Sequence, residues 1–182
     1  IQEESFSVIR SGKDVVGIAQ TGTGKTFAYM LPLLRDLKFS KQVNPRILVL
    51  VPTRELVVQV VEQIELFAKY INVRTLGVYG GVNMNTQMQA LQQGTDIIVA
   101  TPGRLLDLMG QGFVSLQDVQ YSILDEADHM LDMGFIHDIK KIIAKLPTER
   151  QSLFFSATMP PKIVNLSKKI LGNPEKVTIK PE

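Results

Sequence analysis

The sequence predicts an α/β fold in which helices cover both faces of a doubly wound, mainly parallel sheet of about seven strands. Two observations lead to this prediction. Short apolar runs alternate along the chain with segments of helical periodicity, and the polar and glycine-rich motifs fall where the predicted strands end, which is where such sheets bind ligands. With 182 residues, 45% of them hydrophobic, the chain is large enough for one domain, residues 1–182, with a full core.

The predicted elements follow from the period of the apolar residues. Continuous apolar runs predict buried strands, and apolar residues at intervals of three or four, such as Leu56, Val60 and Ile64, predict helices. Gly94 is a stop signal after one of these helices. The predicted strands cover residues 15–18, 46–51, 73–79, 96–100, 119–124, 152–155 and 176–179. The predicted helices include residues 27–31, 54–70, 84–93, 104–109, 135–146 and 162–171.

The stretch after the first predicted strand has the features of a phosphate-binding loop. Its glycines let successive backbone N–H groups point at one place, and the helix that follows adds the positive end of its dipole. Lys25 can reach the β- and γ-phosphates of a nucleotide, and Thr26 can place its hydroxyl on Mg²⁺. Ala19 stands where the strict phosphate-binding-loop pattern has glycine, and this departure narrows the set of protein families that the loop matches. The predicted nucleotide-binding residues here are Gln20, Thr21, Gly22, Thr23, Gly24, Lys25 and Thr26.

Two adjacent carboxylates follow the predicted strand 119–124 and suit the hydrolysis of a nucleoside triphosphate. Asp125, at the end of the strand, suits the second Mg²⁺ contact, through a water molecule, because Mg²⁺ keeps several of its waters. Glu126 can orient and deprotonate the attacking water. Together with Lys25, they form the predicted catalytic group.

The composition excludes several kinds of site. Twenty basic and 18 acidic residues give a net charge of +2, so any nucleic-acid site is expected to be local. The chain has no cysteine, which excludes disulfides and zinc–thiolate sites and suits a reducing compartment. No apolar run reaches the ~18 residues that span a membrane, and no secretory signal is visible. We therefore expect a cytoplasmic protein without a membrane partner.

Residues Asp125 to Asp128 spell the signature of the DEAD-box ATP-dependent RNA helicases, and the chain resembles this family in six motifs that occur in the family's order over nearly its whole length. The segment 129–135 is most similar to the bacterial RhlE group. The other five motifs are Gln20 to Thr26 with Ala19 before them, Pro52 to Leu56, Gly80-Gly81, Thr101 to Arg104, and Ser156-Ala157-Thr158.

The resemblance implies a RecA-like domain and a role for each motif. Gln2 would read the adenine edge, although only Ile1-Gln2 of that motif is present and the upstream aromatic residue is missing. Asp128, Ser156 and Thr158 would couple the ATP site to the RNA site. The residues implied to line the RNA track, through contacts that do not read base identity, are Pro52, Thr53, Arg54, Gly80, Gly81, Thr101, Pro102, Gly103 and Arg104.

Family enzymes use two RecA-like lobes that close on ATP and on single-stranded or structured RNA, and this chain resembles the first lobe, with residues 173–182 as the start of the linker. Motifs of the second lobe, including the one with the catalytic arginine, are absent from residues 1–182. Since such an arginine contributes roughly 10³–10⁵ in rate, we expect this lobe alone to bind nucleotide weakly and to hydrolyse it barely. The sequence does not predict the RNA substrate, the pathway or the oligomeric state.

Three other functions are compatible with part of this pattern. A non-catalytic RNA clamp or scaffold would use ATP only to stay bound to RNA, but the presence of Lys25 and Glu126 speaks against a scaffold without catalytic residues. A DNA-directed translocase would use the same lobe, whereas Asp128 and Gln2 favour RNA. A small-molecule kinase would leave Asp125-Glu126 and Ser156-Ala157-Thr158 without a role.

Overall fold

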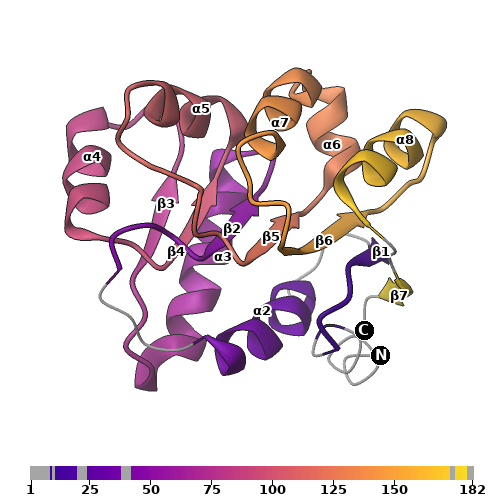
Figure 1. Cartoon of the computed structure of the whole chain (residues 1–182), viewed down its shortest axis with the longest axis horizontal. Coiled ribbons are helices and arrows are strands. Elements are labelled where there is room, and N and C mark those ends of the chain that lie inside the picture. The colour runs from indigo at the N-terminus through magenta and orange to yellow at the C-terminus, as the bar shows by residue number, and fades with distance from the viewer. Residues whose placement is uncertain (1–8, 10, 20–23, 38–41, 173–174, 180–182) are drawn as a thin grey trace.

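The computed structural model describes residues 9, 11–19, 24–37, 42–172 and 175–179, which fold around one central sheet (Figure 1). Within these residues seven strands lie in the order β3-β4-β2-β5-β6-β1-β7, and every neighbouring pair is parallel. The doubly wound parallel sheet predicted from the sequence is thereby confirmed. The strands are β1 (Val15–Ala19), β2 (Ile47–Leu50), β3 (Thr75–Val78), β4 (Ile97–Ala100), β5 (Tyr121–Leu124), β6 (Gln151–Ser156) and β7 (Glu175–Ile179).

Helices cover both faces of the sheet, because the strands bury alternate side chains on opposite sides. In β2, Ile47 and Val49 pack with residues of α2 and α3, whereas Leu48 and Leu50 pack with residues of α4 to α8. Figure 1 shows α5 to α8 above the sheet and α2 below it. The helices are α2 (Gly24–Asp36), α3 (Arg54–Phe67), the 3₁₀ turn η1 (Ala68–Tyr70), α4 (Met84–Gln93), α5 (Pro102–Gly110), α6 (Ala127–Asp132), α7 (Ile136–Ile143) and α8 (Pro161–Ile170).

Most helix boundaries agree with the predicted ones to within a few residues, and one helix was not predicted. The helix over 84–93 matches α4, and Gly94 follows it with a φ of 105°, a conformation that favours glycine. Helix α6 has only six residues, too few to show a helical period, and it is separated from α7 by a turn at Gly134. No helix in the described ranges is both long enough and apolar enough to cross a membrane.

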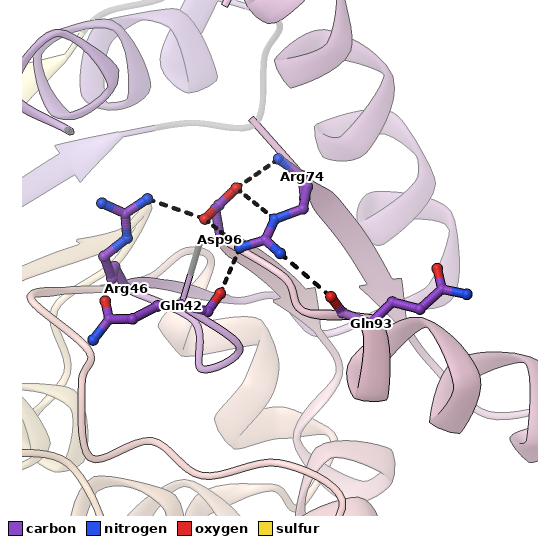
Figure 2. A network of polar contacts seen from close by, with 5 residues as sticks. All are labelled: Gln42, Arg46, Arg74, Gln93 and Asp96. Atoms are coloured by element: carbon purple, nitrogen blue, oxygen red, sulfur yellow. Dashed lines mark hydrogen bonds and ion pairs between the residues drawn. The ribbon is translucent and has the colours of Figure 1, made fainter. Parts of the chain in front are cut away.

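A buried carboxylate ties together the starts of three neighbouring strands at the amino-terminal edge of the sheet (Figure 2). The side chain of Asp96, just before β4, is 3% exposed. Its Oδ1 accepts hydrogen bonds from Nη2 of Arg46 and Nη2 of Arg74, each at 3.0 Å. Its Oδ2 accepts two more from Arg74, from the backbone N at 2.8 Å and from Nε at 3.1 Å. This network fixes the edge of the sheet opposite to the predicted ligand site.

Candidate functional site

The predicted motifs meet at the carboxyl edge of the sheet. Leu50 of β2 pairs with Leu124 of β5, and Leu124 pairs with Phe154 of β6, so these strands end side by side. On the far side of β6, Ile18 of β1 pairs with Ser156. The phosphate-binding loop, the acidic motif and the serine–threonine motif therefore leave adjacent strands at one edge, as expected for a parallel sheet.

The centre of this edge is a buried ion pair between the phosphate-binding loop and the acidic motif. Nζ of Lys25 lies 2.6 Å from Oδ1 of Asp125, and each side chain is 5% exposed. Burial raises the pKa of Asp125, and the attraction of Lys25 offsets only part of this effect. Thr26, next to Lys25, is also buried. The three predicted side chains that would hold phosphate and metal are thus brought together.

Glu126 has the one non-glycine backbone with positive φ in the described part of the chain, at φ 58° and ψ 49°. This left-handed conformation costs roughly 1 kcal/mol or more for a side chain of this kind, and it turns the chain sharply between β5 and α6. Oε1 of Glu126 lies 3.7 Å from Nδ1 of His129. Burial, assisted by the charge of Asp125, raises the pKa of Glu126 against the opposing effects of Lys25 and His129. This shift brings the pKa of Glu126 closer to neutral pH, where a general base is most effective.

The acidic motif is bonded directly to the serine–threonine motif. Oδ2 of Asp128 accepts hydrogen bonds from Oγ1 of Thr158 at 2.8 Å and from the backbone N of Thr158 at 3.1 Å. Oγ of Ser156 accepts a bond from the backbone N of Asp128 at 3.2 Å and donates to the carbonyl of Thr158 at 2.7 Å. Burial acts to raise the pKa of Asp128, but these hydrogen bonds outweigh it and the pKa is lowered. The three residues predicted to couple the sites form one closed network.

The predicted RNA-track residues gather around the loop between β3 and α4. The guanidinium of Arg54 lies 5.5 Å from the centre of the Tyr79 ring. A Cβ at Gly81, which has a φ of 84°, would lie 3.3 Å from Nη1 of Arg54. Arg104 reaches the same loop, where its Nη1 donates to the carbonyl of Val82 at 3.3 Å. Two arginines from separate helices therefore flank one exposed, glycine-containing loop.

The remaining RNA-track residues occupy helix starts. Thr53 caps α3, with its Oγ1 accepting from the backbone N of Leu56 at 3.2 Å. Thr101 precedes α5 and its side chain makes no cap hydrogen bond, and Gly103 is exposed in the first turn of that helix. Pro52 and Pro102 are buried, so they shape the two loops rather than face solvent.

The structure adds residues that the sequence analysis missed. Gln87 is 5% exposed and links the loop between β3 and α4 to helix α5. Its Nε2 donates to the carbonyl of Tyr79 at 3.1 Å, and its Oε1 accepts from Nη1 of Arg104 at 3.2 Å. A signal for it existed: Gln87 and Leu91 lie four residues apart on the buried face of α4, where an amide needs partners. Tyr29 of α2, whose buried ring stacks on that of Phe155, was not predicted either.

Some predicted ligands cannot be placed. Gln2 and residues 20–23 lie outside the described residues, and Gly24 is the first residue of α2. Across the described ranges, no three His, Asp or Glu side chains are grouped so that they could hold a metal ion on their own. The buried Thr26 and Asp125 offer a hydroxyl and a single carboxylate, which suits Mg²⁺ because that ion takes most of its ligands from water and phosphate.

Three comparisons with known proteins agree with this geometry. The profile of the DEAD/DEAH box helicase family matches residues 1–166. The chain is 48% identical over 180 residues to the ATP-dependent RNA helicase DeaD of Buchnera aphidicola, covering 98% of this chain and 30% of that protein. It is 46% identical over 179 residues to the DEAD-box ATP-dependent RNA helicase CshA of Streptococcus pneumoniae, covering 98% of this chain and 34% of that protein.

Solved structures give the same result for the fold. A DEAD box protein from Methanococcus jannaschii superposes with a TM-score of 0.90 at 38% identity, over 97% of this chain and 48% of that one. A hypothetical ATP-dependent RNA helicase from Sulfolobus tokodaii superposes with a TM-score of 0.89 at 39% identity, over 98% of this chain and 51% of that one. The chain therefore has the RecA-like fold of these proteins and spans about half the length of the solved chains.

The chain spans about a third of the length of the curated relatives named above. Assignment to the RhlE group stays a prediction. The match of the family profile to residues 1–166, with the acidic, phosphate-binding and serine–threonine motifs at one edge of a RecA-like sheet, shows that this chain belongs to the DEAD/DEAH box helicase family.

Proposed function

We propose that this chain is the ATP-binding lobe of an RNA helicase that couples ATP hydrolysis to RNA binding and local duplex unwinding. One observation carries the proposal: the acidic motif pairs with Lys25 through Asp125 and accepts a hydrogen bond from Thr158 through Asp128, three positions further along the chain. A change at the nucleotide therefore reaches the serine–threonine motif through one rigid turn.

For the nucleotide, Lys25 is the cation for the β- and γ-phosphates, and residues 20–24 supply backbone N–H groups. Gln2 reads the adenine edge and gives a preference for ATP. Thr26 and, through water, Asp125 hold Mg²⁺, which when bound neutralises charge on the phosphates. Nζ of Lys25 lies 2.6 Å from Oδ1 of Asp125, so the proposed phosphate ligand and the proposed Mg²⁺ ligand are neighbours.

For hydrolysis, Glu126 orients a water molecule and accepts its proton as the water oxygen bonds to the γ-phosphorus and the bond to ADP breaks. Its raised pKa and its place beside Asp125 support this role. The left-handed backbone of Glu126 supports it too, because strained conformations of this kind concentrate at functional sites.

For RNA, Arg54 and Arg104 bind phosphates on either side of the Gly80-Gly81 loop, and the backbone N–H groups of glycines and the hydroxyl of Thr101 add short contacts. Neither type of contact reads base identity, so binding is independent of sequence. The loop is exposed and the arginines approach it from α3 and α5.

A second RecA-like lobe, joined through a linker that begins within residues 173–182 after the last strand, completes the ATP site with an arginine. Within this range, residues 175–179 form β7, which pairs with β1. Without that arginine, worth roughly 10³–10⁵ in rate, residues 1–182 alone hydrolyse ATP barely and do not unwind RNA. We place the protein in the cytoplasm, in line with its lack of cysteine.

The test is ATP turnover by the complete gene product without nucleic acid, with single-stranded RNA and with single-stranded DNA, using Glu126→Gln as the blank. Stimulation by RNA alone, lost in the variant, supports the helicase and the role of Glu126. Equal stimulation by DNA would favour a translocase. Tight ATP binding without stimulation would favour an ATP-gated RNA clamp, which strand-release measurements on a short duplex would distinguish from a helicase.

A further inference from the structure

Gln87 is a buried glutamine on the inner face of α4. It is 5% exposed and lies four residues, about one helical turn, before the buried Leu91. Its neighbours Met84 and Met88 pack against the same core. A methionine would fill the position of Gln87 without placing an amide in the core, so the polar group needs an explanation.

Both ends of the Gln87 amide contact the proposed RNA site. Nε2 donates to the carbonyl of Tyr79, which precedes Gly80-Gly81, at 3.1 Å. Oε1 accepts from Nη1 of Arg104, on α5, at 3.2 Å. The ring of Tyr79 in turn faces the guanidinium of Arg54, which lies 5.5 Å from the ring centre. One buried side chain therefore connects the two sides from which arginines approach the glycine loop.

The contacts of Arg104 hold its guanidinium in place without neutralising it. Both of its hydrogen bonds to described residues use Nη1, one to Gln87 and one to the carbonyl of Val82 at 3.3 Å. These acceptors are uncharged, and none of the carboxylates in the described ranges forms an ion pair with Arg104. A guanidinium has five N–H donors, so those on Nε and Nη2 are left for a phosphate, which arginine binds with forked hydrogen bonds.

We propose that Gln87 is a positioning residue that orients Arg104 toward an RNA phosphate before RNA binds and, being uncharged, leaves the full positive charge of Arg104 for that phosphate. Gln87 acts through Arg104 and does not contact RNA. Orientation in advance raises affinity because an arginine already held in its bound conformation loses less conformational freedom on binding. This inference rests on the proposed function, since it requires an RNA phosphate at Arg104.

Two substitutions of Gln87 have different expected effects on RNA binding. Gln87→Met fills the space but removes the acceptor, so Arg104 keeps its charge and loses its orientation. The RNA affinity should fall by roughly two- to tenfold, the cost of ordering one long side chain, while the slope of log affinity against log salt stays the same. Gln87→Glu keeps an acceptor and adds a charge that pairs with Arg104, so the affinity should fall and the slope should decrease by about one phosphate contact.

The effect of Gln87→Met should also depend on Arg104. In an Arg104→Ala background there is no guanidinium to orient, so adding Gln87→Met should leave the RNA affinity unchanged. The ATP affinity should stay the same in every variant. Gln87 is bonded to the end of β3, and strands β4, β2, β5 and β6 lie between β3 and β1, which leads into the phosphate-binding loop.

The experiment titrates a fluorescent single-stranded RNA oligonucleotide with the complete gene product at several salt concentrations, with Mg²⁺ and a non-hydrolysable ATP analogue present. The matched control is Gln89→Met, the same change at an exposed position of the same helix. Melting temperatures without ligand report the stability of each variant. Lower affinity at an unchanged slope for Gln87→Met, no further loss in the double variant and a reduced slope for Gln87→Glu would support the proposal.

Wild-type protein that binds RNA, with a Gln87→Met variant of equal affinity, would overturn this inference and leave the proposed function intact. The same proportional loss of affinity in the wild-type and Arg104→Ala backgrounds, with a lower melting temperature, would also overturn it, since Gln87 would then serve only the fold. An unchanged slope for Gln87→Glu would do the same, whether or not Gln87→Met folds. Wild-type protein that does not bind RNA would refute both proposals.

Discussion

Replacement of Asp96 by asparagine tests whether the charged network at the amino-terminal edge holds the sheet together. The substitution keeps the size of the side chain but removes its charge. In the wild type the two carboxylate oxygens accept four hydrogen bonds from Arg46 and Arg74, at 2.8 to 3.1 Å (Figure 2). An asparagine keeps one accepting oxygen and turns an NH₂ group, a donor, toward guanidinium donors.

The magnitude follows from what each arginine can do after the change. Arg74 has a side chain that is 35% exposed, and it also donates to the carbonyls of Gln42 and Gln93, so water replaces part of its loss. The side chain of Arg46 is 6% exposed, and its charge stays buried without a counter-ion from Asp96. Loss of one partner of a buried ion pair lowers the free energy of unfolding by about 3–5 kcal/mol. Because water partly hydrates Arg74, we expect Asp96→Asn to lie near the lower end of this range, at about 3 kcal/mol. For a chain of this size, that is a decrease of roughly 6–12 °C in melting temperature.

The pH dependence gives a second signature. Burial by itself would raise the pKa of Asp96, but hydrogen bonds from Arg74 and Arg46 outweigh it, and the pKa is lowered. The folded state therefore favours the ionised carboxylate. Its contribution to stability is complete above the unfolded pKa of about 3.9 and is lost as the pH falls below it, toward the folded pKa. The difference between wild type and Asp96→Asn should thus be constant near neutrality and shrink below about pH 4.

Urea denaturation at several pH values measures both effects, with the exposed Asp107→Asn as the matched control for loss of one negative charge. A difference in unfolding free energy below about 1 kcal/mol at pH 7 would refute the reasoning, because surface ion pairs reach that size. A difference that persisted unchanged in acid would assign the loss to packing rather than to charge.

Three further substitutions test the proposed site on the complete gene product. Lys25→Met removes the cation proposed to bind the β- and γ-phosphates and should weaken nucleotide binding at least tenfold in titrations, because a charge-assisted contact to phosphate is lost; unchanged affinity would contradict the predicted phosphate-binding loop. Arg104→Ala should weaken RNA binding and leave the ATP affinity unchanged. In binding measurements at several salt concentrations, the slope of log affinity against log salt should decrease by about one phosphate contact. An unchanged slope would show that Arg104 does not contact an RNA phosphate. Thr158→Val removes the hydroxyl that donates to Asp128, and steady-state assays should show basal turnover retained with RNA stimulation reduced; full stimulation would exclude this contact from the coupling.

Strands β2 and β4 could be predicted from the sequence because each is buried on both faces and reads as an uninterrupted apolar run. All four residues of β2, and all four of β4, are buried. Since the strands are parallel, prediction of their ends also indicated the edge of the sheet at which the motifs that follow β1, β5 and β6 meet. This part of the site required only the order of the motifs and the type of sheet.

Details that depend on tertiary approach were beyond the sequence. The predicted helix over 135–146 continues past the end of α7 because Leu146, in the turn that follows, is buried as well and extends the apolar period. The buried position of Gln87 on α4 leaves a trace in the local pattern, but its contact with Arg104 does not, and neither does the stacking of Tyr29 on Phe155. Such contacts join residues from different elements, and their partners are defined only by the packing of α2, α4 and α5 on the sheet.

The acidic motif shows why the geometry is needed to assign roles. Asp125, Glu126 and Asp128 lie within four residues, and all three carry the same functional group, a carboxylate. In the structure, burial raises the pKa of Asp125 and of Glu126, whereas hydrogen bonds from Thr158 and Ser156 lower that of Asp128. A carboxylate with a raised pKa suits proton transfer, and one with a lowered pKa suits a permanent acceptor. The turn at Glu126 separates the two environments, since Asp125 before it pairs with Lys25 and Asp128 after it accepts hydrogen bonds from Thr158.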